Sequence, residues 1–103
     1  MAAMRKPLDL ETAELVAERF RALGDPTRLL ILELLWRDGE VSVREIAARV
    51  GGSQQNVSKH LSVLRVQGIV ARRKQGTSSL YRIADLGVLR LCEEGFRDQR
   101  SAQ

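Results

Sequence analysis

Residues 42–68 read SVREIAARVGGSQQNVSKHLSVLRVQG, and this stretch decides the fold. Ser42 and Glu45 form a capping box, which predicts a short helix over about residues 43–50. Two glycines end that helix and give the turn its freedom, and Ser53 then provides the N-cap of a second helix. Two helices joined by a tight glycine-containing turn are typical of a helix-turn-helix.

Two further helices are predicted before this stretch. Asp9 is a suitable N-cap for the first, in which apolar residues recur every three or four positions. Gly24 is expected to end it in a left-handed conformation, and Asp25 and Pro26 supply the N-cap and first turn of the next helix. That second helix extends to about Arg37 and is apolar on nearly every side, so it should be the buried central helix.

The residues after the stretch follow a different pattern. Ile69–Lys74 and Ser79–Ile83 hold β-branched and aromatic residues on either side of a polar tip, which predicts a β-hairpin. Asp85 can then cap a last helix. The chain is therefore expected to be mainly α-helical, with about five helices and a two-stranded hairpin, or wing, after the helix-turn-helix.

The chain has 103 residues, one Cys and a formal net charge of +4. This length predicts one domain, 1–103, with a core over about residues 9–97 and frayed ends. One Cys cannot form an intrachain disulfide, and the apolar runs are too short to cross a bilayer. No apolar segment follows the basic pair at residues 5 and 6, so we expect no signal peptide and a soluble cytoplasmic protein without membrane contacts.

Charge is distributed unevenly along the chain. Residues 1–50 carry 8 basic and 9 acidic residues, whereas residues 51–103 carry 9 basic and 4 acidic residues. No acid occurs from Gly52 to Ala84, where six bases fall. A segment of one charge sign within a folded domain indicates a polyanionic partner such as nucleic acid, although small basic proteins also carry such patches by chance.

The helix that begins after Ser53 has one apolar face, around Val57. Its opposite face carries short or amide side chains and a lysine, with no acid among them. Gln and Asn can pair bidentately with adenine in the major groove, and Ser can donate or accept a hydrogen bond. The alternative is an ordinary solvated face, which commonly includes Glu. The pattern favours DNA contacts by the residues of this face: Gln55, Asn56, Ser58, Lys59 and Ser62.

The predicted hairpin places basic residues next in the chain. Arg72, Arg73 and Lys74 precede its tip, and Arg82 lies on the returning strand. A basic β-ribbon can follow a phosphate backbone or place an arginine in the minor groove. The alternative is a charged edge strand that discourages aggregation. Because the hairpin directly follows the candidate recognition helix, we interpret it as a second DNA contact.

Three stretches resemble the ArsR/SmtB family of bacterial winged helix-turn-helix repressors: ALGDPTRL at 22–29, GSQQNVSKHL at 52–61 and LRVQGIV at 64–70. The likeness implies a homodimer in which the first and last helices meet and each recognition helix enters a major groove. It assigns DNA contacts to Gln54, Gln55, Asn56, Ser58 and Lys59 and, in the wing, to Arg72, Arg73, Lys74 and Thr77. It implies a dimer interface that includes Ala13, Val16, Phe20, Leu89, Cys92 and Phe96.

The sequence departs from the family at its metal sites. Metal-sensing members carry a Cys-Val-Cys box, and the matching stretch here places Ser42 and Arg44 at the two thiolate positions. A second family site uses Asp and His on the last helix; Asp85 is present, but residues 86–96 contain no His. One Cys and one His per chain make neither site. We therefore expect no metal site of the usual kinds and no cofactor.

Cys92 and His60 each allow two interpretations. Cys92 shares a helical stripe with Leu89 and Phe96, which favours a buried core or interface thiol. The alternative is a redox switch, in which two copies of Cys92 form a disulfide between subunits. His60 borders an apolar face, and the sequence offers no recognisable catalytic triad, which favours packing or capping over catalysis.

The resulting prediction is a dimeric, sequence-specific DNA-binding transcriptional regulator, most simply a repressor that occupies an inverted repeat in a promoter. Its partners are double-stranded DNA and a second copy of the chain, with room for an unidentified effector or partner protein. A protein-interaction module is the alternative, and the acid-free stretch argues against it. An enzyme is the weakest option, because the sequence has no catalytic constellation or phosphate-binding loop.

Overall fold

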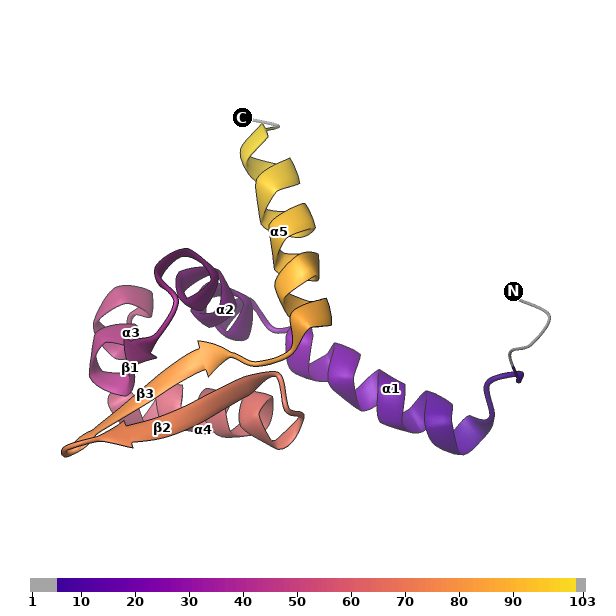
Figure 1. The fold of residues 1–103 in the computed structure, drawn as a ribbon, viewed down its shortest axis with the longest axis horizontal. Helices are drawn as coiled ribbons and strands as arrows, with labels where there is room; N and C mark the ends of the chain where they lie inside the picture. The colour runs from indigo at the N-terminus through magenta and orange to yellow at the C-terminus, as the bar shows by residue number, and fades with distance from the viewer. Residues whose placement is uncertain (1–5, 102–103) are drawn as a thin grey trace.

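The computed structural model describes residues 6–101. Of the ends that are expected to fray, residues 1–5, 102 and 103 lie outside the described part. Within it, no helix combines the length and the hydropathy that crossing a membrane requires. The elements follow one another as α1 (Leu10–Leu23), α2 (Pro26–Asp38), β1 (Val41–Ser42), α3 (Val43–Val50), α4 (Gln54–Val66), β2 (Val70–Gln75), β3 (Ser78–Ile83) and α5 (Leu86–Ser101) (Figure 1).

The mainly helical fold with a hairpin wing is confirmed, but the sheet has three strands in place of the predicted two. Its order is β1-β3-β2, and both pairs are antiparallel. In β1, Val41 pairs with Tyr81 and Ser42 pairs with Leu80. A strand of two residues has no alternating pattern for a sequence to display, and its partner lies about forty residues further along the chain. The pairing joins the start of α3 to the base of the wing.

The predicted helix caps are confirmed. The side chains of Asp9 and Asp25 accept hydrogen bonds from the third residues of α1 and α2, at 2.7 and 3.0 Å. Ser42 and Ser53 do the same for α3 and α4, at 3.1 and 3.0 Å. Each of these side chains satisfies a backbone N–H that has no partner inside its helix. The four helix starts are therefore fixed by local sequence.

Gly24 departs from its predicted conformation. Its φ is −87°, so it is not left-handed, although its N–H still closes α1 on the carbonyl oxygens of Phe20 and Arg21. A Cβ atom at this position would lie 3.2 Å from the carbonyl oxygen of Phe20. The glycine therefore serves the tight junction of α1 with α2 by its small size and not by a positive φ.

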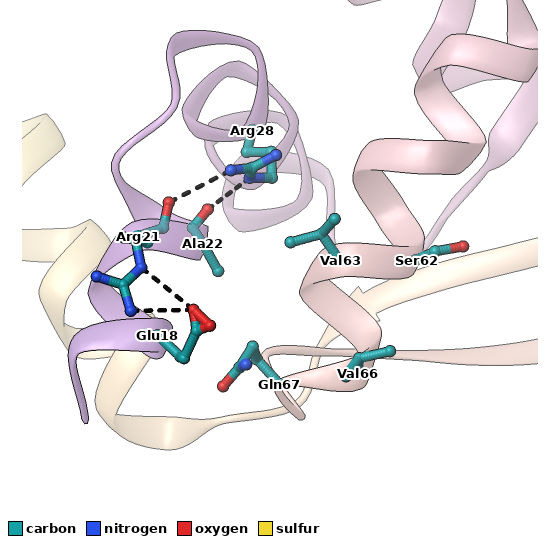
Figure 2. Close-up of a pocket in the computed structure, with 8 residues that line it drawn as sticks. All are labelled: Glu18, Arg21, Ala22, Arg28, Ser62, Val63, Val66 and Gln67. Atoms are coloured by element: carbon teal, nitrogen blue, oxygen red, sulfur yellow. Dashed lines mark hydrogen bonds and ion pairs between the residues drawn. The ribbon is translucent and has the colours of Figure 1, made fainter. Parts of the chain in front are cut away.

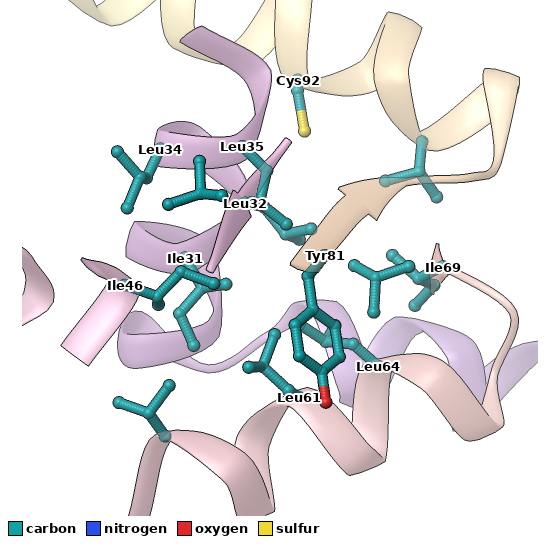
Figure 3. Close-up of a cluster of buried hydrophobic side chains, with 14 of the residues drawn as sticks. Ile31, Leu32, Leu34, Leu35, Ile46, Leu61, Leu64, Ile69, Tyr81 and Cys92 are labelled. Carbon is teal, nitrogen blue, oxygen red and sulfur yellow. The ribbon is translucent and has the colours of Figure 1, made fainter. Parts of the chain in front are cut away.

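The core lies between α2, α3, α4 and the sheet (Figure 3). It includes residues that are completely enclosed on each of the three helices, such as Ile31, Ile46 and Leu61. α2 contributes four buried residues to this core, as predicted for the central helix, but Leu29 and Leu30 are 41% and 53% exposed. Apolar residues fall on nearly every side of α2, so the sequence gives little sign of which leucines turn outward.

α1 and α5 extend away from this body (Figure 1). α5 packs on α2 through Val88, Cys92 and Phe96, and the ring of Phe96 lies 5.6 Å from that of Trp36 between centroids. The backbone of α5 stays helical to Ser101, beyond the expected core limit of residue 97. Along α1, only Ala22 is buried among the described residues of the helix. Much of the apolar surface of α1 is consequently uncovered.

Candidate nucleic-acid interface

α4 has the orientation that a recognition helix needs. Val57, Leu61 and Leu64 are completely enclosed by the core, so the other side of the helix faces outward. The predicted contacts on that side are exposed, apart from Ser58, which is half-buried; the exposed residues are Gln54, Gln55, Asn56, Lys59 and Ser62. The structure thus brings the predicted α4 residues together on one surface that carries no carboxylate of its own.

Arg28 of α2 connects the end of α1 to α4. Its Nε donates to the carbonyl oxygen of Ala22 at 2.7 Å and its Nη2 donates to that of Arg21 at 3.3 Å (Figure 2). Its Nη1 lies 3.1 Å from Nδ1 of His60 on α4. A guanidinium can only donate, so Nδ1 of a neutral His60 accepts this bond. Asp25 lies 4.0 Å from the same nitrogen, and its pKa is lowered chiefly by the backbone N–H of Arg28.

Arg19 of α1 makes a second connection, at the C-terminal end of α4. Its Nη1 donates to the carbonyl oxygen of Gln67, the C-cap of α4, and its Nη2 pairs with Asp85 at 2.6 Å. Asp85 in turn accepts from the N–H of Val88 at 3.0 Å, which caps α5 and is the main reason that its pKa is lowered. One side chain therefore joins α1, α4 and α5.

The wing divides its basic residues between two faces. Residues directly opposite each other in an antiparallel pair point to the same side of the sheet. Arg72 lies opposite the buried Tyr81, so Arg72 and Lys74 share the side on which the sheet packs against the helices. β2 contacts α4 on this side. Arg73 points to the other side.

Arg73 is held within the chain and is not a free wing cation. Its Nε and Nη2 donate to the two carboxylate oxygens of Glu40 at 2.8 and 2.7 Å. This bidentate pair lowers the pKa of Glu40 and raises that of Arg73. Thr77, by contrast, is exposed in the two-residue turn that closes the hairpin, beside Gly76 with its φ of 63°. The wing thus presents Arg72, Lys74 and Thr77 more freely than Arg73.

The residues assigned to a dimer interface do not all lie on a free surface. Val16 and Phe20 are 39% and 63% exposed and line a groove of about 270 Å³ between α1 and α5. Leu91, which is 53% exposed, lines the α5 side of this groove and was not predicted. Ala13 is half-buried on α1. On α5, Cys92 and Phe96 pack on the chain's own core and Leu89 is half-buried, and the assignment of these three residues to an interface stays a prediction.

The burial of Cys92 supports its interpretation as a core thiol. It is 6% exposed, and burial raises the pKa of its thiol from 9.0 to about 11. Because the thiolate is the reactive form, we expect iodoacetamide at pH 8 to alkylate the native protein about 100-fold more slowly than the unfolded chain in urea. Mass spectrometry of timed samples would measure both rates. Equal rates in the two states would contradict this assignment of Cys92.

Within residues 6–101, no group of three or more His, Cys, Asp and Glu side chains is placed to hold a metal ion. Asp85 is occupied with Arg19 and the start of α5. The two positions that the family resemblance assigns to thiolates carry a helix cap, Ser42, and an exposed cation, Arg44.

Sequence reasoning missed the roles of Arg19, Arg28 and Leu91. Leu91 falls on a separate side of α5 from the Cys92 stripe, and an exposed leucine among charged residues is the signal that could have marked it. The bonds of Arg19 reach residues 48 and 66 positions away, so no local pattern indicates them.

The chain is similar to known DNA-binding regulators over most of its length. A family model described as a helix-turn-helix domain matches residues 23–73. An uncharacterized HTH-type transcriptional regulator of Methanocaldococcus jannaschii is 45% identical over 76 residues, which are 74% of this chain and 85% of that protein. A transcriptional repressor SmtB homolog of Synechocystis is 38% identical over 87 residues, 84% of this chain and 65% of that protein.

Solved structures agree with the sequence comparisons. One is the solution structure of the homodimeric winged helix-turn-helix DNA-binding domain Mb0332 from Mycobacterium bovis, described as a possible ArsR-family transcriptional regulator. It superposes with a TM-score of 0.77 at 34% identity and covers 94% of this chain and 91% of that chain. HlyU from Vibrio cholerae superposes with a TM-score of 0.78 at 30% identity and covers 86% of this chain and 96% of that chain.

Proposed function

Because this chain belongs to the ArsR/SmtB family of winged helix-turn-helix transcriptional regulators, we propose that it is a homodimeric repressor that binds an inverted repeat in promoter DNA in the cytoplasm. Its role is regulatory and not catalytic. The observation that carries the proposal is the exposed, acid-free face of α4, with Arg72 and Lys74 of the wing beside it.

The proposed complex follows from the size of α4 and the shape of DNA. A single helix fits the major groove, where the amides of Gln55 and Asn56 can read base edges. Arg72 and Lys74 are suited to the phosphate backbone beside that groove, because a contact to phosphate positions the protein without reading sequence. Two copies related by a two-fold axis then place their recognition helices about 34 Å apart, on half-sites one turn apart.

The dimer is proposed to form through the groove between α1 and α5. Val16 and Phe20 on α1 and Leu91 on α5 are apolar and exposed on the described chain, and burial of such side chains drives association. The homodimeric state of the Mycobacterium bovis domain supports this arrangement.

Selection of bound duplexes from random DNA tests the proposed function. We expect an inverted repeat to emerge, and if the dimer neutralises about eight phosphates, log affinity should fall against log salt with a slope near −7. Weak binding without a preferred sequence, or an affinity that does not change with salt, would contradict the proposal.

Variants separate base reading from backbone contact in the same assay. Asn56→Ala should relax the preference for the selected sequence, with a loss of about 1–3 kcal/mol per half-site on the selected duplex and less on a scrambled duplex. Arg72→Ala should instead weaken binding to both duplexes alike, because phosphate is present in every sequence. Equal loss of preference in both variants would contradict these roles.

A further inference from the structure

A small polar hollow lies where the start of α3, the start of α4 and the tip of the wing come together. Its volume is about 180 Å³. Hydroxyl, amide and guanidinium groups line it, and among the described residues around it none is acidic. The polar lining consists of Ser42, Arg44, Gln54, Thr77, Ser78 and Ser79.

Arg44 is the one cation of this lining, and its charge is available. Arg49, on the same helix, forms the ion pairs near Arg44. Its Nε lies 2.9 Å from Oε2 of Glu45, and its Nη2 lies 3.5 Å from Oδ2 of Asp38. In the described part of the chain, no hydrogen bond or ion pair is found for Arg44, and its side chain is exposed. The oxygen of Ser42 accepts the N–H of Glu45, which leaves its own proton free to donate.

The position of the hollow matches the path of a DNA strand. Gln54 lies at the first turn of α4 and Thr77 at the tip of the wing, and both belong to the proposed DNA surface. The DNA backbone that separates the major groove from the adjacent minor groove carries one phosphate per nucleotide. If α4 occupies the groove and the wing lies on its flank, this phosphate strand passes between them, over the hollow.

We propose that this hollow binds one backbone phosphate of the operator in each half-site, with Arg44 as the charged contact and the hydroxyls of Ser42 and Ser79 as further donors. The proposal rests on the proposed function, and it adds α3 to the DNA-binding surface. Arginine suits such a site because its planar fork donates to two phosphate oxygens at once.

The test uses the full-length protein and the selected operator, in which single phosphates are replaced in turn by uncharged methylphosphonates. For the wild type, we expect one position in each half-site where this replacement lowers affinity about tenfold and Arg44→Ala removes most of that sensitivity. Arg44→Ala should also lower affinity for the unmodified operator about 100-fold, because both half-sites lose the contact, and reduce the salt slope by about 2, one phosphate in each protomer. Arg44→Lys should restore the slope.

Arg49→Ala is the matched control, because it removes one positive charge from the same helix outside the hollow. We expect it to change the salt slope little and to leave the methylphosphonate profile of the wild type intact. Similar profiles for Arg44→Ala and the wild type would overturn the proposal. Circular dichroism and thermal melts establish that each variant is folded.

Two further outcomes are distinguishable. If no methylphosphonate position lowers affinity, but inorganic phosphate at fixed ionic strength raises the Tm of the wild type and not that of Arg44→Ala, the hollow holds free phosphate and the backbone assignment is wrong. If the wild type selects no sequence at all, the proposed function itself fails, whatever Arg44 does.

Discussion

Phe20→Asp is expected to convert the dimer into monomers and to lower affinity for the selected operator by about 100-fold or more. Phe20 is 63% exposed and lines the groove between α1 and α5, so in the proposed dimer its ring would be buried against the second copy. A carboxylate at this position would lose its hydration without a partner charge. Each monomer would then bind one half-site without the gain from a linked second contact.

Sedimentation velocity gives the oligomeric state, and gel shifts give the affinity. Phe20→Leu keeps an apolar side chain and should remain dimeric, and Glu14→Ala, outside the groove, should behave as wild type. A Phe20→Asp protein that stays dimeric and binds with unchanged affinity would show that the copies meet elsewhere.

Leu32→Ala is expected to destabilise the fold by about 2–5 kcal/mol. Leu32 of α2 is completely enclosed in the protein core, so truncation of its side chain removes buried apolar contacts and leaves a cavity. For a domain of this size the loss corresponds to a decrease in Tm of about 10 °C or more. Urea unfolding at a fixed protomer concentration measures the effect, because the proposed dimer would link stability to concentration.

Leu30→Ala on the same helix is the matched control. Leu30 is 53% exposed, and the same chemical change there should lower the free energy of unfolding by less than about 1 kcal/mol. Equal losses at the two positions would mean that the outward side of α2 is covered in the native protein.

The parts of the fold that follow from the sequence are those fixed by neighbouring residues. Asp9, Asp25, Ser42 and Ser53 each bond to a backbone N–H three residues further on, so a reading of local motifs locates the starts of four helices. The outward face of α4 is predictable for a similar reason. Its buried residues repeat at helical spacing, and its polar side carries no acid.

The features that the sequence did not reveal are those that distant residues decide. α5 has apolar residues on more than one side, and Cys92 turns inward because α2 lies on that side; the chain's own pattern does not say so. Arg73 looks like its neighbour Arg72 in sequence, but Glu40, 33 residues earlier, holds it in an ion pair. The two residues of β1 are a strand only because β3 lies next to them.

The bonds of Arg19 have a consequence for which DNA sites the protein can use. This side chain connects the last turn of α4 to α1 and α5, the helices proposed to join the two copies. In the proposed dimer, this connection would hold the separation and relative rotation of the two recognition helices independently of the DNA. An extra base pair in the spacer moves one half-site by about 3.4 Å and turns it by about 35° around the duplex axis. Spacer length would therefore exclude many genomic sequences whose two half-sites are each correct.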